Sequence, residues 1–149
     1  MAQATTRSFA GYKILLEDAT SPATYVAPCG FTERSVRFTK EVNDVNVPSC
    51  DDEDAASWVE RDIVSKSVTV SGNGVMSLEA EPRWLAVWQS DLPFNVRIEK
   101  SGNLAAGGGY WLGKFHLTSM EEGAVKGNRV TKSIEMVSTG AVVWTPASS

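Results

Sequence analysis

Apolar and polar residues alternate with a period of two along much of the chain. Phe94, Val96 and Ile98, for example, are separated by polar residues. This alternation is typical of half-buried β-strands. The same pattern predicts strands near residues 12–16, 35–39, 67–71, 94–99 and 130–144. Residues 110–120 are also strand-like, but apolar residues occupy both parities there, as in a strand covered on both faces.

One segment, residues 77–89, has the spacing of an amphipathic helix instead. Leu78, Leu85 and Trp88 fall on one helical face, and Trp84 precedes Trp88 by four residues. We therefore predict a single helix there, with Trp84 and Trp88 packed against the rest of the protein.

Composition supports a mainly β fold of one domain. Seventeen Val and eleven Thr outnumber eight Leu, and β-branched residues suit a pleated, half-buried surface. A length of 149 residues corresponds to one ordinary domain, taken as residues 1–149 with flexible termini. The prediction is a β-sandwich or barrel with one flanking α-helix and a long acidic loop after an early strand.

The charge is concentrated in that loop, residues 41–62, which carry eight acids and one base. The segment has a net charge of −7, whereas the whole chain has −4, so the remainder carries +3. A chain without a dense basic stripe is a poor candidate for sequence-specific DNA binding. Carboxylates in such number are too costly to bury without partners, so they face either water or another chain. The candidate contact residues are Glu41, Asp44, Asp51, Asp52, Glu53, Asp54, Trp58 and Arg61.

Three motifs resemble chemical sites, and none fits the chemistry. Residues 108–114 have the spacing of a phosphate-binding loop, but Phe115 stands where Ser or Thr must bind magnesium, so we expect a strand. The acidic run 51–54 lacks the alternate spacing and central Gly of a calcium loop. Cys29 and Cys50 lie too far apart for a zinc motif and are expected to be packed, reduced thiols, with a disulfide as the alternative.

The nearest candidate nucleophiles for the single histidine, His116, are Ser119 and Ser133, but no acid is placed by sequence to orient the ring and no GxSxG motif is present. We therefore expect no enzyme, no cofactor and no metal. No apolar run approaches the length of a membrane span, and the N-terminus lacks the apolar stretch of a signal peptide. Synthesis in the cytoplasm without membrane contact is the expectation.

Several blocks together resemble the major tail tube proteins of long-tailed siphophages, especially those of phage-like gene transfer agents. The central block is CDDEDAASWVERD at 50–62, followed by SKSVTVSGNG at 65–74. Further blocks are GYWLGKF at 109–115, NRVT at 128–131 and GAVVWTP at 140–146. The blocks are structural rather than catalytic, and their order extends the resemblance over most of the chain.

The resemblance implies a subunit that forms stacked, hexameric rings in the virion tail. DNA would pass through the hollow tube into the host without specific binding, and residues 41–62 with the terminal arms would join one ring to the next. Implied partners are further copies of the chain, a tape measure protein, and tail tip or terminator proteins. A type VI secretion-like tube protein and a monomeric β-sandwich binding module remain as alternatives.

Overall fold

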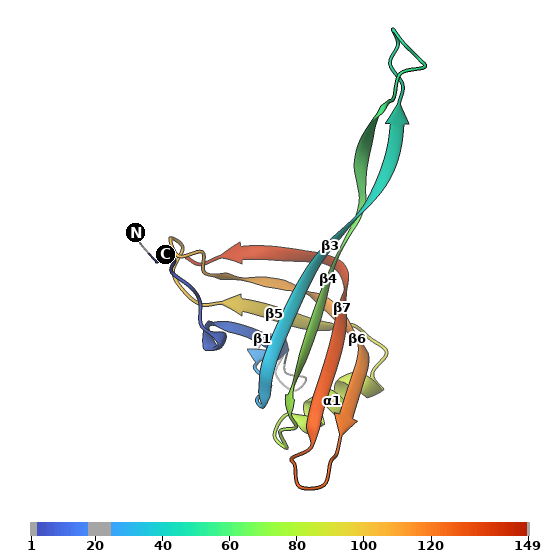
Figure 1. Ribbon diagram of the computed structural model, residues 1–149. Helices are drawn as coiled ribbons and strands as arrows, with labels where there is room; N and C mark the ends of the chain where they lie inside the picture. Colours follow the sequence, from blue (N-terminus) through green and yellow to red (C-terminus); the bar gives the residue numbers. More distant parts are fainter. Residues whose placement is uncertain (1–2, 18–24, 149) are drawn as a thin grey trace.

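The computed structural model describes residues 3–17 and 25–148, and its seven strands form one antiparallel sheet (Figure 1). The order across the sheet is β2-β1-β5-β6-β7-β4-β3. A short 3-10 helix, η1, and one α-helix, α1, accompany the strands. The bounds are η1 Phe9–Gly11, β1 Tyr12–Glu17, β2 Tyr25–Val26, β3 Phe31–Val47, β4 Trp58–Val75, α1 Glu81–Gln89, β5 Phe94–Lys100, β6 Gly109–Gly123 and β7 Thr131–Pro146.

The sheet bends on itself and encloses the core, so the predicted mainly β fold with one helix is confirmed. β6 and β7 belong to both halves of the bend, as the sharply curved red and orange strands show (Figure 1). The first half contains β1 and β5, and the second half contains β4 and β3. One core cluster unites residues of both halves with Trp84 of α1. The fully buried members are Leu16, Val70, Trp84, Val96, Ile98, Phe115 and Met136.

The bend occurs where β7 carries extra residues opposite β6. Leu112 pairs with Val143 and Lys114 with Thr139, so the register shifts between these pairs. Gly113 lies at this point, where a Cβ atom would stand 2.8 Å from a methyl carbon of Val142. Such bulges bend a strand and increase its twist, which lets one sheet form two facing layers.

The sheet is not closed, although its two ends approach each other. Arg34 of β3 donates hydrogen bonds from Nη1 to the backbone oxygens of Phe9 and Tyr12, next to and within β1. Its guanidinium also lies 4.1 Å from the centre of the Phe9 ring. Partial burial lowers the pKa of Arg34, but an arginine remains a cation at neutral pH. One side chain thus bridges the gap that no strand pairing closes.

The helix begins later than residue 77, and its buried face differs from the prediction. Trp84 and Val87 are buried, whereas Trp88 is 53% exposed. Pro82 occupies the first turn of α1, where the backbone N–H that proline lacks would have no partner within the helix. The helix therefore starts close to Pro82, and Leu78 lies before it. Trp84 turns toward the core because its ring meets Phe31 edge-on, with centroids 5.9 Å apart. The prediction for Trp84 is confirmed, and the prediction that Trp88 is packed is wrong.

The segment 41–62, expected to be a loop, is mostly strand. β3 and β4 continue to pair through Val42↔Ile63 as far as Val47↔Trp58, and only residues 48–57 connect them. The acids of this region alternate with valines, and both faces of the paired strands are exposed, so charge does not oppose strand formation here.

Candidate assembly surfaces

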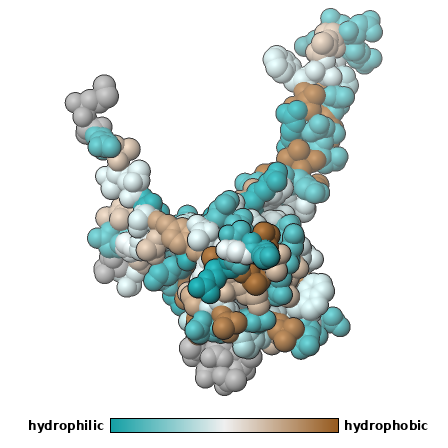
Figure 2. Space-filling view, turned by 60° about the horizontal axis from the view of Figure 1, so that its bottom comes forward, coloured by the Kyte–Doolittle hydropathy of each residue, from teal (hydrophilic) through white to brown (hydrophobic). Residues whose placement is uncertain are grey.

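The far part of the β3–β4 hairpin projects from the body as a two-stranded ribbon, which we call the arm, residues 41–65 (Figure 1). Apolar side chains lie along it below a mostly hydrophilic tip (Figure 2). Trp58 is 89% exposed, more than any other large hydrophobic residue described. A two-stranded ribbon alone is marginal in water, so this surface is typical of one that is covered in an assembly. The exposed apolar residues of the arm are Val42, Val45, Val47, Trp58, Val59, Ile63 and Val64.

Cross-strand pairing places several of the predicted contact residues together on the arm. Asp44 pairs with Arg61, and Arg61 Nε donates to Asp44 Oδ1 at 3.0 Å. Both side chains are 60% exposed, so this ion pair contributes at most about 1 kcal/mol to folding. Glu41 lies at the base of the arm, next to the bulge that leaves Val64 unpaired.

The tip, residues 48–57, carries the four consecutive acids of the sequence. Two local hydrogen bonds shape its turn. The Asp54 backbone amide donates to the side-chain oxygen Asp52 Oδ1 at 3.2 Å, and the Ala55 backbone amide donates to the backbone oxygen of Asp52 at 3.3 Å. Asp51 and Glu53 are exposed as well. Trp58 pairs with Val47 directly below the tip, so the four acids and Trp58 form one exposed group.

Two strands of the second half of the sheet have free edges. β3 pairs with β4 alone, and β6 pairs with β5 only up to Phe115, so residues 116–123 of β6 have no described partner on that side. The alternation of directions across β6-β7-β4-β3 makes β3 antiparallel to β6. Free edges of this length readily pair with another chain. Sequence reasoning missed both edges, because strand order depends on pairing between distant segments.

The same half of the sheet has one apolar face and one polar face. Val36, Val70, Ile134 and Met136 point to the core side, and the opposite face carries small polar residues and three carboxylates. A shallow hollow of about 260 Å³ on this polar face is lined by Glu33, Ser35, Ser71, Asn73, Ser119, Glu121, Ser133 and Glu135. The alternation of Ser and Glu with apolar residues near 133–136 was the sequence signal for this face.

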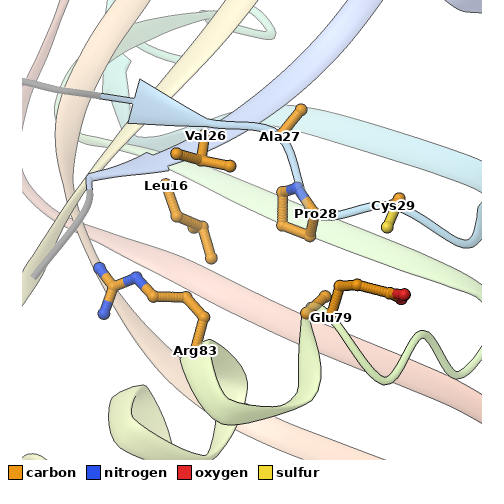
Figure 3. A pocket seen from close by; sticks show the side chains of 8 residues that line it. Leu16, Val26, Ala27, Pro28, Cys29, Glu79 and Arg83 are labelled. Carbon is orange, nitrogen blue, oxygen red and sulfur yellow. The ribbon is translucent and has the colours of Figure 1, made fainter.

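A pocket of about 260 Å³ lies between α1 and the β1–β2 end of the sheet (Figure 3). Leu16 and Pro28 provide apolar lining. The Arg83 side chain extends into the space, and its Nη2 donates a hydrogen bond to the backbone oxygen of Glu17. Cys29 at its rim lies 3.0 Å from the Ser77 hydroxyl. This arrangement holds α1 against the sheet and contains no reactive set of groups.

Both cysteines are free, and both are exposed, so the expectation of packed thiols is wrong. Cys29 lies next to the start of α1, and Cys50 lies at the tip of the arm, where strand pairing has ended. No group of three or more His, Cys, Asp and Glu side chains within 3–17 and 25–148 could hold a metal ion. Residues 109–114 begin β6, which confirms the strand predicted there. No described helix is long and apolar enough to cross a membrane.

Comparison with known proteins agrees with these features. A family model described as phage tail tube protein matches residues 9–144. The fold is similar to a chain in the tail of an empty gene transfer agent particle determined with C6 symmetry, with a TM-score of 0.76 and 19% identity over 94% of this chain and 99% of that one.

Two further structures have the same fold. A chain of the native gene transfer agent virion has a TM-score of 0.73 and 18% identity over 94% of this chain and 99% of that one. The SPP1 tail tube has a TM-score of 0.67 and 8% identity over 95% of this chain and 80% of that one. No curated protein matches the sequence.

Proposed function

The chain belongs to the phage tail tube protein family, and from this premise we propose that it forms six-membered rings that stack into a hollow tail tube. DNA would pass through this tube from the particle into the host cell. The C6 symmetry of the similar gene transfer agent tail supports the ring number. The arm carries the proposal, because its apolar side chains are exposed in the single chain, which is typical of a surface that another chain covers.

In the proposed stack, the arm of one subunit contacts the next ring. A contact between different ends of like subunits repeats without closing and so generates a filament. The end of the body opposite the arm, which we call the foot, comprises residues 76–81 and 124–130. Its turn carries two bases, Lys126 and Arg129, together with the exposed Val125. The other segment of the foot carries two acids, Glu79 and Glu81, so the foot as a whole is neutral. The arm has a net charge of −7 and the remaining residues carry +3, so the arm is complementary in charge to the body of the next subunit, which favours one register.

Within a ring, we propose that the free edge of β3 pairs with the free edge of β6 in the neighbouring subunit. Because β3 runs antiparallel to β6, this pairing continues the antiparallel order of the sheet from one subunit to the next. Backbone hydrogen bonds along such edges provide association without requiring specific side chains. Six such junctions would close the four-stranded halves into a continuous barrel.

The polar face of this half-sheet would line the lumen, because the other face is occupied by the core. Glu33, Glu121 and Glu135 would repel the phosphates of passing DNA, and register places two bases, Arg37 and Lys114, on the same face nearer the arm. Lysine and arginine arrays hold DNA by releasing counterions, so a lumen with mainly carboxylates and hydroxyls lets DNA slide.

Further parts of the proposal follow from the family membership. The tube would enclose a tape measure protein and end at tail tip and terminator proteins, and the subunit would be made in the host bacterial cytoplasm before it enters the tail. A type VI secretion-like tube would use the same ring contacts. A monomeric binding module would leave the arm without a partner.

Electron microscopy of the purified protein at high concentration tests the proposal. The wild type is expected to form rings or tubes. A variant in which Asn-Gly replaces residues 43–62 keeps the Val42↔Ile63 pair as the end of a tight hairpin. It is expected to melt at the wild-type temperature, because the arm contributes no buried residue, and to form no tubes. A wild type that stays monomeric, or tubes of normal length from the shortened variant, would contradict the proposal.

A further inference from the structure

An apolar groove of about 690 Å³ opens where the arm leaves the body. Phe38, Val68, Trp111 and Val142 line its apolar part. The ring centroids of Phe38 and Trp111 lie 5.2 Å apart, yet Phe38 remains 51% exposed. The two halves of the sheet diverge here, and no described segment fills the space between them.

Two lysines at the rim of the groove have no acid partner. Lys40 and Lys66 are a directly opposed cross-strand pair, and like charges in this position repel each other. Neither lysine makes a salt bridge with any residue of 3–17 or 25–148. Trp111 also has its Nε1–H buried without an acceptor among these residues. The groove therefore offers apolar surface and two positive charges without an acid partner among the described residues, which suits an acidic, apolar segment.

The foot carries a segment of that character, residues 78–81. Leu78 is 77% exposed, and Glu79 is exposed beside it, with Glu81 at the start of α1. Ser77 Oγ donates to Glu79 Oε2 at 2.8 Å, and this hydrogen bond lowers the pKa of Glu79, so the carboxylate is charged at neutral pH.

Geometry distinguishes this segment from the acidic tip of the arm. The groove lies at the arm end of the body, where β3 and β4 leave it, while the foot lies beyond the other ends of the same strands (Figure 1). Head-to-tail stacking brings the arm end of one subunit against the foot of the next. The tip, by contrast, lies beyond the six cross-strand pairs from Val42↔Ile63 to Val47↔Trp58, about 20 Å along the arm from the groove, so it reaches past the junction at which groove and foot meet.

We infer that the groove binds residues 78–81 of the subunit stacked on it, with Leu78 against Trp111 and Phe38 and the two glutamates beside Lys40 and Lys66. This inference rests on the head-to-tail stacking proposed above and names a second contact of that stack. The arm then runs alongside the next subunit while the groove receives its foot.

Charge exchange tests the contact. The double variant Lys40→Glu/Lys66→Glu is expected to keep the wild-type melting temperature and to raise the protein concentration needed for tubes at least about tenfold, because like charges then face each other. Adding Glu79→Lys/Glu81→Lys to the same chain is expected to restore tubes. Lys66→Glu alone is expected to raise this concentration by a smaller factor, and Lys13→Glu, an exposed charge reversal on β1, is its control and is expected to leave tube formation unchanged.

The outcomes separate this inference from the proposed function. If the double variant forms tubes as the wild type does while the shortened arm prevents them, the stack stands and the groove contact is wrong. A second result would overturn the inference. If Asp51→Lys/Asp52→Lys restores tubes of the double variant and Glu79→Lys/Glu81→Lys does not, then the groove binds the arm tip instead of the foot.

Cross-linking gives an independent readout that does not require long tubes. Ser138→Cys places a thiol at the groove, because the Ser138 hydroxyl lies beside the Val68 amide there, and native Cys29 lies beside Ser77 at the foot. With Cys50→Ser, a short bismaleimide is expected to link subunits into a ladder on a denaturing gel. With Cys29→Ser and native Cys50 at the arm tip, no ladder is expected. The reverse result would overturn the inference.

Discussion

At the scale of single residues, the least expected feature is a lysine on the core side of the sheet. Lys132 has the same parity in β7 as Ile134 and Met136 and is only 4% exposed. Its Nζ lies 3.5 Å from Oε1 of Glu122, the residue opposite it in β6, and makes no hydrogen bond with the described residues. One carboxylate at the edge of the core therefore compensates a buried charge.

We expect substitution of Glu122 and substitution of Lys132 to have unequal effects on the free energy of unfolding. Glu122→Gln leaves the ammonium without its counter-charge and is expected to lower the free energy of unfolding by about 1–3 kcal/mol, since the carboxylate is partly exposed. Lys132→Met removes the charge itself and is expected to be neutral or stabilising. Urea unfolding of the two variants measures both values. A larger loss for Lys132→Met than for Glu122→Gln would show that the ion pair contributes net stability.

At the scale of elements, the two longest strands serve two different purposes along their length. The inner parts of β3 and β4 contribute Val36, Val68 and Val70 to the core region, whereas their outer parts form an arm with both faces exposed. Folding free energy therefore comes from the inner parts, and the apolar surface of the arm remains available for association.

Substitution of two tryptophans distinguishes the residues that stabilise the fold from those that take part in association. Trp84→Ala removes a side chain that is 2% exposed, and the free energy of unfolding is expected to fall by about 3–5 kcal/mol. Trp58→Ala is expected to change stability by no more than about 0.5 kcal/mol, because the side chain is exposed, and to weaken tube formation. Thermal unfolding and sedimentation measure the two effects. Unchanged sedimentation of Trp58→Ala would exclude Trp58 from the contact.

At the scale of the whole molecule, the charge is divided between the ends and faces of one small domain. The arm carries −7 and the rest of the chain +3. The foot has two bases and two acids, and the polar face of the sheet carries carboxylates. Such a distribution favours association between different ends of like subunits and disfavours binding of DNA to the polar face.

Reversing the charge of the arm tip tests the electrostatic part of stacking. The quadruple variant of residues 51–54 to Lys is expected to keep its melting temperature, since all four sites are exposed. It is expected to form no tubes, because its tip would then repel the body of the next subunit, where the residues outside the arm carry a net +3. Wild-type assembly should also weaken with added salt, given a screening length of about 8 Å at 0.15 M. Normal tube length from the variant would leave the packing of Trp58 as the remaining candidate contact.

Reversing the charge of the polar face tests the lumen. The wild-type protein is expected to show no measurable affinity for duplex DNA at physiological salt in a gel shift. Tubes of the triple variant Glu33→Lys/Glu121→Lys/Glu135→Lys are expected to assemble normally but to retain single- or double-stranded DNA in a salt-dependent way. Equal DNA retention by wild-type and variant tubes would place these residues outside the lumen.

The sequence by itself determined what local periodicity encodes: the β class, the approximate strands, one helix and an exposed acidic segment. Period-two alternation is a property of neighbouring residues, so the alternation at 94–99 predicts the strand that the structure has there. Tertiary structure alone decided that residues 41–47 pair with 58–65 as an arm, because pairing joins distant segments. It also decided which face of α1 is buried, since Trp84 meets Phe31 from another strand. The free edges and the groove exist only once the sheet has bent.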